Sequence, residues 1–391
     1  MAGHRRHVNC ILPPHLLRRL LDSRNAEIRH AALNTLLSTA RLRGERALMA
    51  SFAAAPGGAR RTIYDCRHST SLRSVRLTRS EDGEASRDDA VNRAFDGFGA
   101  TRTFYREILN RDSIDDQGRR LDGYVHYGRA YNNAFWNGRE MVFGDGDGVL
   151  FTDFTKSLDV IAHELTHGVT EFAAGLEYHD QPGALNESMS DVFGSLVKQW
   201  SLKQSAEEAD WLIGADVFTP DIRADALRSM KAPGTAYDNP DLGKDPQPDS
   251  MDKYAQLPNT DEGDNGGVHI NSGIPNKAFY VTAREIGGFA WEAPGHIWYE
   301  ALRASGPNTT FQEFADTTYQ KAGQLYGAGS AQQKAVFEGW AEVKIKITGV
   351  DAAPPPAPGD KELITLLVKQ VDDLSATVKQ LAEELNRIKS A

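Results

Sequence analysis

Apolar residues recur at steps of three and four over several long stretches of this 391-residue chain. That spacing places them on one face of an α-helix. The helices that it predicts cover residues 16–21, 28–42, 88–98, 103–109, 158–173 and 185–197, after which the chain is mostly helical to about residue 349.

Shorter runs that favour β-strands lie among the early helices, at residues 61–64, 124–127 and 140–143. We therefore expect residues 60–157 to form a strand-rich N-terminal lobe and residues 158–350 a helical C-terminal lobe. The pattern indicates a two-lobed α+β fold with a cleft between the lobes, beneath the helix at 158–173. Residues 237–265 are rich in proline, aspartate and glycine and should form a loop.

Each end of the chain carries a helical segment that a linker sets apart. Residues 1–50 precede an Ala/Pro/Gly linker at 51–59, which suits proteolytic processing. A Pro-rich linker at 351–360 precedes residues 361–391, where apolar residues fill the a and d positions of heptads. These positions are Ile364, Leu367, Val371, Leu374, Val378, Leu381, Leu385 and Ile388. They favour a parallel two-stranded coiled coil and thus a homo-oligomer, with three strands or a helix packed on the body of the protein as alternatives.

Charge is unevenly distributed. Residues 1–50 hold nine Arg, no Lys and three acidic residues, a net +6, whereas the rest of the chain holds 35 basic and 51 acidic residues, a net −16. Opposite charge favours docking of the first 50 residues on the rest. We expect no nucleic-acid partner, because the arginines are scattered among leucines. No run of about 18 apolar residues predicts a membrane span.

The most informative motif is H-E-x-x-H at residues 163–167. On the predicted helix, His163 and His167 share a face and can bind one metal ion through imidazole nitrogens. Glu164 lies beside them, where it can accept a proton from the attacking water. A catalytic zinc site usually has a third protein ligand and an open position.

The third ligand should come from the helix at 185–197. Glu187 and Asp191 are four residues apart on it, so we assign Glu187 to the metal and Asp191 to the N–H of a ligand histidine. A solvated acidic face is the alternative, but the neighbouring residues are apolar, and a buried acid needs a partner.

These motifs sit within longer ones. They are residues 163–200, Y-N-N-A-F-W-N-G at 131–138, G-D-G-D-G at 144–148, L-R-S-M at 227–230 and D-N-G-G-V-H-I-N-S-G at 264–273. Over roughly residues 60–350 the chain resembles the thermolysin family of zinc metallopeptidases. Residues 10–17, C-I-L-P-P-H-L-L, resemble the start of the short propeptide in the protealysin-like branch of that family.

The resemblance implies a role for each matching position. His163, His167 and Glu187 would bind zinc, and Glu164 would be the general base that later passes its proton to the leaving amine. Tyr178 and His269 would donate hydrogen bonds to the oxyanion, with Asp264 orienting His269. Taken alone, His269 would more simply be a buried core histidine whose ring nitrogens have hydrogen-bond partners within the protein. The substrate strand would be held by Asn133, the backbone of Ala134 and Arg228. An apolar pocket for the residue after the cleaved bond would comprise Phe151, Phe154, Val160, Ile213, Val217 and Leu227.

The expected function is thus a zinc endopeptidase that cleaves on the N-terminal side of hydrophobic residues. Residues 1–50 would be an inhibitory propeptide, with the extended strand Ile11, Leu12, Pro13 and Pro14 in the cleft. Cys10 could cap the zinc of a latent form, although a buried thiol is the simpler interpretation. Cys10 and Cys66 do not predict a disulfide framework.

The chain departs from the family at the double calcium site. Asp159 and Asp210 match two ligands, but Lys198, Leu212 and Ala215 replace acidic ones. An ammonium group among carboxylates can substitute for the charge of a cation, so we expect the double site to be lost. Residues 218–225 match another calcium loop only weakly.

Two other functions remain open from the residues alone. A zinc aminopeptidase shares H-E-x-x-H and a distant glutamate, but it needs an acidic group for the free amine of its substrate. A catalytically dead scaffold could act through the C-terminal heptads, although Glu164, Tyr178 and His269 are all present. The family is mostly extracellular, whereas residues 1–21 lack the apolar core of a secretory signal. We therefore expect export by another route, or else a cytoplasmic protein.

Overall fold

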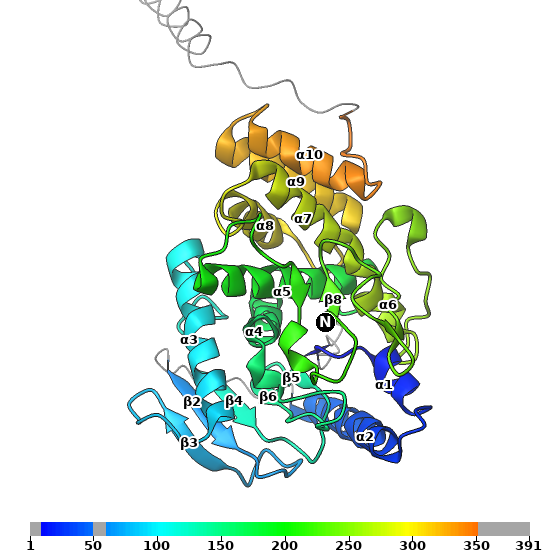
Figure 1. The fold of residues 1–391 in the computed structure, drawn as a ribbon. Helices are drawn as coiled ribbons and strands as arrows, with labels where there is room; N and C mark the ends of the chain where they lie inside the picture. The colour runs from blue at the N-terminus through cyan, green and yellow to red at the C-terminus, as the bar shows by residue number, and fades with distance from the viewer. Residues whose placement is uncertain (1–8, 50–59, 351–391) are drawn as a thin grey trace, which may run out of the picture.

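The computed structural model describes residues 9–49 and 60–350. The linker expected at 51–59, the Pro-rich segment at 351–360 and the heptads at 361–391 lie outside the described residues. The described chain forms the two expected parts, a lobe built around a β-sheet and a helical lobe above it (Figure 1).

A six-stranded sheet organises the N-terminal lobe, with the order β1-β5-β6-β4-β2-β3. The strands are β1 (Asn9–Cys10), β2 (Arg61–Asp65), β3 (Arg76–Ser80), β4 (Leu121–Val125), β5 (Ala134–Trp136) and β6 (Met141–Phe143). The β2–β4 and β4–β6 pairs are parallel, whereas β2–β3, β5–β6 and β1–β5 are antiparallel. Strand β1, which comes from the first 50 residues, therefore adds to the free edge of β5.

The predicted strands at 61–64, 124–127 and 140–143 correspond to β2, β4 and β6, although β4 begins and ends earlier than predicted. Strands β3 and β5 were not predicted. The side chains of β3 are exposed or half-buried, so the strand lacks an apolar alternation. All three residues of β5 are buried, and a run of three apolar residues is too short to show the alternation of polar and apolar positions that predicts a strand.

The helix predicted near residues 88–98 and 103–109 is α3 (Asp89–Leu109), which Asp88 caps at its N-terminus. A Cβ atom at Gly97 would lie 2.7 Å from Ile161 Cδ1 on the central helix. The glycine thus permits close packing of two helices instead of ending one.

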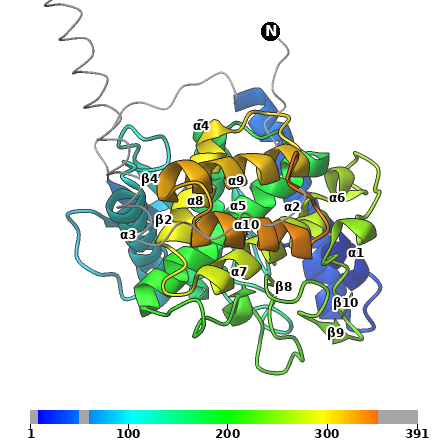
Figure 2. The same ribbon diagram turned by 90° about the horizontal axis from the view of Figure 1, so that it is seen from above.

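The first 50 residues continue from β1 into α1 (Pro14–Leu20) and α2 (Ala26–Met49). In both views these helices lie beside the sheet edge and the loop before α6 (Figures 1 and 2). Arg43 forms an ion pair with Asp261 at 3.0 Å, and Arg18 forms one with Glu262 at 3.6 Å. The basic segment is docked on acidic loop residues, as the charge distribution indicated.

The centre of the molecule is the helix pair α4 (Leu158–Ala173) and α5 (Asp180–Leu202). Every residue of α4 from Asp159 to Thr170 is buried, so this helix runs through the core. A Cβ atom at Gly194 would lie 2.6 Å from the carbonyl oxygen of Asp159. Only a residue without a side chain allows α5 to approach α4 this closely.

Up to residue 350, the remaining C-terminal elements are five further helices and several short strands and 3-10 helices. The helices are α6 (Asp264–Asn271), α7 (Gly273–Ile286), α8 (Ala293–Ala304), α9 (Phe311–Tyr326) and α10 (Ala331–Glu342). The short elements are η1 (Phe154–Lys156), β7 (Leu212–Ile213), η2 (Ala215–Val217), β8 (Arg228–Ser229), β9 (Asp238–Asn239), β10 (Gly243–Lys244) and η3 (Met251–Lys253). Over residues 9–49 and 60–350, none of the helices combines the length and apolar character needed to cross a bilayer.

Candidate active site

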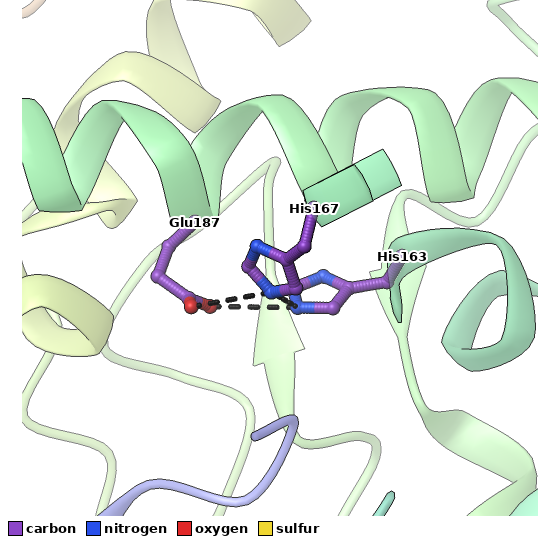
Figure 3. A group of neighbouring side chains, drawn as sticks. All are labelled: His163, His167 and Glu187. Carbon is purple, nitrogen blue, oxygen red and sulfur yellow. Dashed lines mark hydrogen bonds and ion pairs between the residues drawn. The ribbon is translucent and has the colours of Figure 1, made fainter. Parts of the chain in front are cut away.

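Three buried side chains from α4 and α5 converge at the centre of the molecule (Figure 3). His163 and His167 are one turn apart on α4, and their Nε2 atoms are 3.0 Å apart. The Glu187 carboxylate on α5 lies 3.5 Å from His163 Nε2 and 3.4 Å from His167 Nε2. All their potential ligand atoms lie within 4.8 Å of one another.

The protonation pattern of the two histidines fits a cation at this point. His163 Nδ1 lies 2.8 Å from Asp191 Oδ1, and His167 Nδ1 lies 2.8 Å from Asn186 Oδ1. Because both partners are acceptors, each Nδ1 can donate a proton to its partner, and the two Nε2 atoms face each other and Glu187. Burial lowers the pKa of His163, but hydrogen bonds to Asp191 and Glu187 raise it above its usual value. Burial lowers the pKa of His167 to about 3, so this imidazole is neutral, as a metal ligand must be. Two imidazoles and one carboxylate are the donor set of a catalytic zinc site.

Asp191 connects the metal ligands to the substrate side of the cleft. Its carboxylate accepts hydrogen bonds from Arg228 Nε at 2.8 Å, Arg228 Nη2 at 2.7 Å and Asn276 Nδ2 at 2.8 Å, besides facing His163. Burial by itself would raise the pKa of Asp191, but Arg228 and His163 hold it at about 2. Asp191 therefore stays ionised and orients both a ligand histidine and Arg228.

The sequence did not reveal all of this supporting shell. Asn186, which orients His167, and Asn276, which binds Asp191, were not predicted. Asn186 lies next to Glu187 in the chain, so its position beside a predicted ligand was a usable signal. Asn276 lies on α7, three residues after the motif at 264–273 but 85 residues after Asp191, and only the fold brings these two side chains together.

Glu164 follows His163 on α4. Both oxygens of its carboxylate are buried without a hydrogen-bond partner of good geometry among the described residues. Burial raises the pKa of Glu164 well above its usual value. A carboxylate with unsatisfied acceptors next to a metal ligand is suited to binding a water molecule.

Tyr178, Asp264 and His269 lie on the other side of the metal ligands. His269 Nδ1 is 2.6 Å from Asp264 Oδ1, and the Tyr178 hydroxyl is 3.3 Å from His269 Nε2 and hydrogen-bonded to Glu187. Burial lowers the pKa of His269, but the Asp264 and Glu187 carboxylates raise it to about 9. His269 therefore carries a proton on Nε2, which points into the cleft.

The turn that precedes His269 depends on glycine. Gly266 and Gly267 have φ values of 85° and 78°, which residues with a side chain rarely adopt. The D-N-G-G motif thus folds back so that Asp264 can reach both the backbone N–H and the ring of His269.

Strand β1 and the residues after it occupy the cleft. Ile11 N donates to the carbonyl oxygen of Ala134 at 3.1 Å, and Arg228 Nη1 donates to the Ile11 carbonyl at 3.0 Å. Leu12 N donates to Asn133 Oδ1 at 2.9 Å. Pro13 then precedes α1 as its N-terminal cap, and Pro14 is the first residue of that helix. The residues expected to hold a substrate strand here hold residues 11 and 12 of the chain itself.

The six residues expected to form the apolar pocket are all buried, and they belong to the main hydrophobic core, which contains most buried apolar side chains of both lobes, Ile11 and Leu12 included. They are Phe151, Phe154, Val160, Ile213, Val217 and Leu227. Cys10 instead belongs to a second cluster with Leu42, Tyr131 and Phe135. Within the described ranges, the group that could hold a metal comprises His163, His167 and Glu187, and Cys10 is a buried cysteine outside that group.

The region expected to have lost the double calcium site contains a lysine bridge. Lys198 Nζ lies 3.2 Å from Asp159 Oδ2 and 2.9 Å from Asp210 Oδ2. Burial would lower the pKa of Lys198, but the two carboxylates raise it above its usual value. The ammonium group lies between the two acids that the family would use as calcium ligands.

Comparison with known proteins agrees with this geometry. The family model of the thermolysin metallopeptidase catalytic domain matches residues 51–171, and that of the thermolysin metallopeptidase α-helical domain matches residues 174–345. The fold and the site thus define a zinc metallopeptidase, and the chain belongs to the thermolysin family.

Individual relatives extend the likeness to nearly whole proteins. An extracellular metalloprotease of Pectobacterium carotovorum subsp. carotovorum is 46% identical over 352 residues, which are 88% of this chain and 98% of that protein. Protease PrtS of Photorhabdus sp. (strain Az29) is 49% identical over 293 residues, 74% of this chain and 78% of that protein.

Among solved structures, the precursor of protealysin, a metalloproteinase from Serratia proteamaculans, is 47% identical with a TM-score of 0.78. The match covers 86% of this chain and 99% of that one. The protein is a neutral metalloendopeptidase whose cofactor is zinc. Family membership decides against the aminopeptidase and the dead scaffold that the residues alone left open.

Proposed function

We propose that this endopeptidase is made as a self-inhibited zymogen and that it cleaves on the N-terminal side of hydrophobic residues. One observation carries the proposal: Ile11 and Leu12 hydrogen-bond to Ala134, Arg228 and Asn133, the groups assigned to a substrate strand. A substrate cannot use these donors and acceptors until the first 50 residues leave.

The proposed chemistry assigns one task to each group. Bound zinc polarises the substrate carbonyl and makes a water molecule acidic. Glu164 accepts the proton of the attacking water and delivers it to the leaving amine. His269 and Tyr178 donate hydrogen bonds to the oxygen that gains negative charge, and Asp264 fixes the ring of His269. The Tyr178 hydroxyl, which binds Glu187 while the cleft is filled, would turn to the substrate.

Specificity should come from the apolar pocket. Its six side chains have no charge with which to hold a polar residue, and all of them are buried among other apolar side chains. Burial of an aliphatic side chain contributes on the order of 2 kcal/mol, a preference of roughly thirtyfold over a small residue. Mass spectrometry of a digested, denatured protein should show Leu, Ile, Phe or Val after the cut bonds. A preference for Lys or Asp there would contradict the pocket assignment.

The zymogen proposal is tested with the purified full chain and a quenched internal peptide. The uncut chain should be inactive, and activity should appear together with cleavage within the linker at 51–59. A zinc chelator should abolish it. Glu164→Gln should accumulate uncut, and full activity of the uncut wild-type chain would contradict the proposal.

We further propose that the chain is divided into a propeptide (1–50), a processing linker (51–59), lobes at 60–157 and 158–350, a Pro-rich linker (351–360) and a tail (361–391).

Two features of the whole protein remain proposals. The Pectobacterium relative is named as extracellular, which supports secretion of this chain. The apolar heptads of residues 361–391 support a homo-oligomer, most simply a parallel dimer. Peptide substrates and the protein's own propeptide are its other proposed partners.

A further inference from the structure

The chain segment in the cleft is bound in a defined register. The carbonyl oxygen of Cys10 accepts a hydrogen bond from His269 Nε2 at 2.8 Å. The next amide, Ile11 N–H, donates to Ala134, and the next carbonyl, that of Ile11, accepts from Arg228. Consecutive polar groups of the segment thus meet consecutive groups of the enzyme.

The register is fixed on both sides of this point. Upstream, Asn9 and Cys10 pair antiparallel with Trp136 and Phe135 of β5. Downstream, the side-chain amide of Asn133 accepts from Leu12 N at 2.9 Å and donates to the Leu12 carbonyl at 3.4 Å. A shift by one residue would break all of these bonds and turn each side chain to the opposite face of the strand.

This register brings one peptide bond to the catalytic groups. His269 is a donor to the oxygen of the bond being cleaved, and the oxygen that it contacts belongs to Cys10. The residue after that bond is Ile11, whose side chain is fully buried in the main hydrophobic core, which also contains the six residues expected to form the pocket. The bond between them therefore has its carbonyl on the proposed oxyanion donor, and the side chain that follows it is apolar and buried.

We propose that the Cys10–Ile11 peptide bond is itself a cleavage site, hydrolysed by the same molecule in which it lies. The inference rests on the proposed zymogen. Water supplies an oxygen to the Cys10 carbonyl carbon, the C–N bond to Ile11 breaks, and a water proton passes through Glu164 to the departing nitrogen. The products are a peptide that ends in the Cys10 carboxylate and a chain that begins with the Ile11 amine.

The reaction is slow compared with cleavage of a free substrate, for two structural reasons. The Tyr178 hydroxyl donates its hydrogen to Glu187, so it must turn before it can donate to the oxygen of the bond being cleaved. The new amine also stays in place, because Ile11 and Leu12 run directly into α1, which is anchored through Arg18 on Glu262. A bound product can rejoin or block the cleft, which is how a substrate-like segment acts as an inhibitor.

The test uses purified full-length protein at two concentrations tenfold apart, quenched with acid over time and analysed by intact-mass spectrometry. A fragment ending at Cys10 should appear in the wild type with a half-time independent of concentration, as a reaction within one molecule requires. Glu164→Gln should not produce it. Ile11→Leu should retain the reaction, whereas Ile11→Gly, which leaves the pocket unfilled, should slow it at least tenfold.

A second measurement keeps the test independent of variant folding. A synthetic peptide of residues 5–20 is incubated with the activated enzyme and should be cut between Cys10 and Ile11. The inference is overturned if the wild type cleaves its linker and becomes active while all released propeptide keeps the Cys10–Ile11 bond intact. That result would leave the zymogen proposal standing, whereas a full chain active before any cleavage would overturn both.

Discussion

At the scale of single residues, the proposed mechanism assigns Glu164 to proton transfer and not to metal binding. Its carboxylate is buried beside His163 but is not one of the three clustered ligands. Glu164→Gln keeps the size of the side chain and removes its basicity, so kcat/KM should fall at least about a hundredfold. Zinc content by elemental analysis should stay at one per chain. Retention of more than about a tenth of the activity, a loss below ~1.4 kcal/mol, would remove Glu164 from the role of base.

His126 offers a prediction about pH, away from the metal ligands. Its ring lies between Asp145 and Asp88, at 2.8 Å from each, and His68 contacts the second oxygen of Asp145. The Asp145 hydrogen bond, opposed by burial, raises the pKa of His126 from 6.5 to about 9. Because the folded pKa is raised, the stabilisation is fully present below about pH 6.5 and is lost as the pH rises through about 9.

The measurement compares Tm in the uncut Glu164→Gln background. Adding His126→Gln should lower Tm clearly at pH 6 and much less at pH 10. His296→Gln is the matched control, because burial lowers the pKa of His296 and that ring gains no charge-dependent stability. Equal losses for His126→Gln at both pH values would mean that the protonated bridge does not stabilise the fold.

At the scale of elements, Lys198 joins α5 to the start of α4 and to the loop that contains Asp210. Asp159 is fully buried, so Lys198→Met leaves its carboxylate without a cation. The free energy of unfolding should fall by on the order of 3 kcal/mol. The loss is no larger because Asp210, the second partner of Lys198, is half-exposed. Thermal unfolding should show a lower Tm than for Lys334→Met, which removes an exposed lysine from α10.

The same bridge predicts independence from calcium. A calcium-selective chelator should leave the Tm of the wild type nearly unchanged, because the ammonium group already supplies positive charge between the two acids. Lys198→Glu, in contrast, should gain stability from millimolar calcium. A large fall in the wild-type Tm that calcium restores would contradict the loss of the double site.

At the scale of the whole molecule, assembly should be separable from catalysis. The a and d positions of residues 361–391 are all apolar, and a single helix would leave that stripe in water. Removing residues 354–391 should give a monomer with unchanged activity on small peptides, since the Pro-rich linker separates the tail from the cleft. Leu374→Lys with Leu381→Lys should have the same effect. Light scattering that finds one chain per particle in the full-length protein would exclude the coiled coil.

The sequence by itself determined the chemistry of this protein, because the spacing of residues along a helix decides which side chains share a face. Two histidines four residues apart on a helix must share a face, and Glu187 with Asp191 repeats the same rule on the next helix. The helix predicted at 158–173 is α4, residue for residue. The basic charge of residues 1–50 also correctly indicated docking on the acidic remainder.

Only the tertiary structure decided which distant groups meet. Strand β5 is recognisable only through its neighbours β1 and β6. Asn276 reaches Asp191 because α7 packs near α5, and no pattern along the chain encodes that approach. The alignment of Cys10 with His269, 259 residues away, likewise depends on edge pairing between β1 and β5. Such pairing is set by backbone hydrogen bonds, which every residue but proline can make, so its register could not be read from the side chains alone.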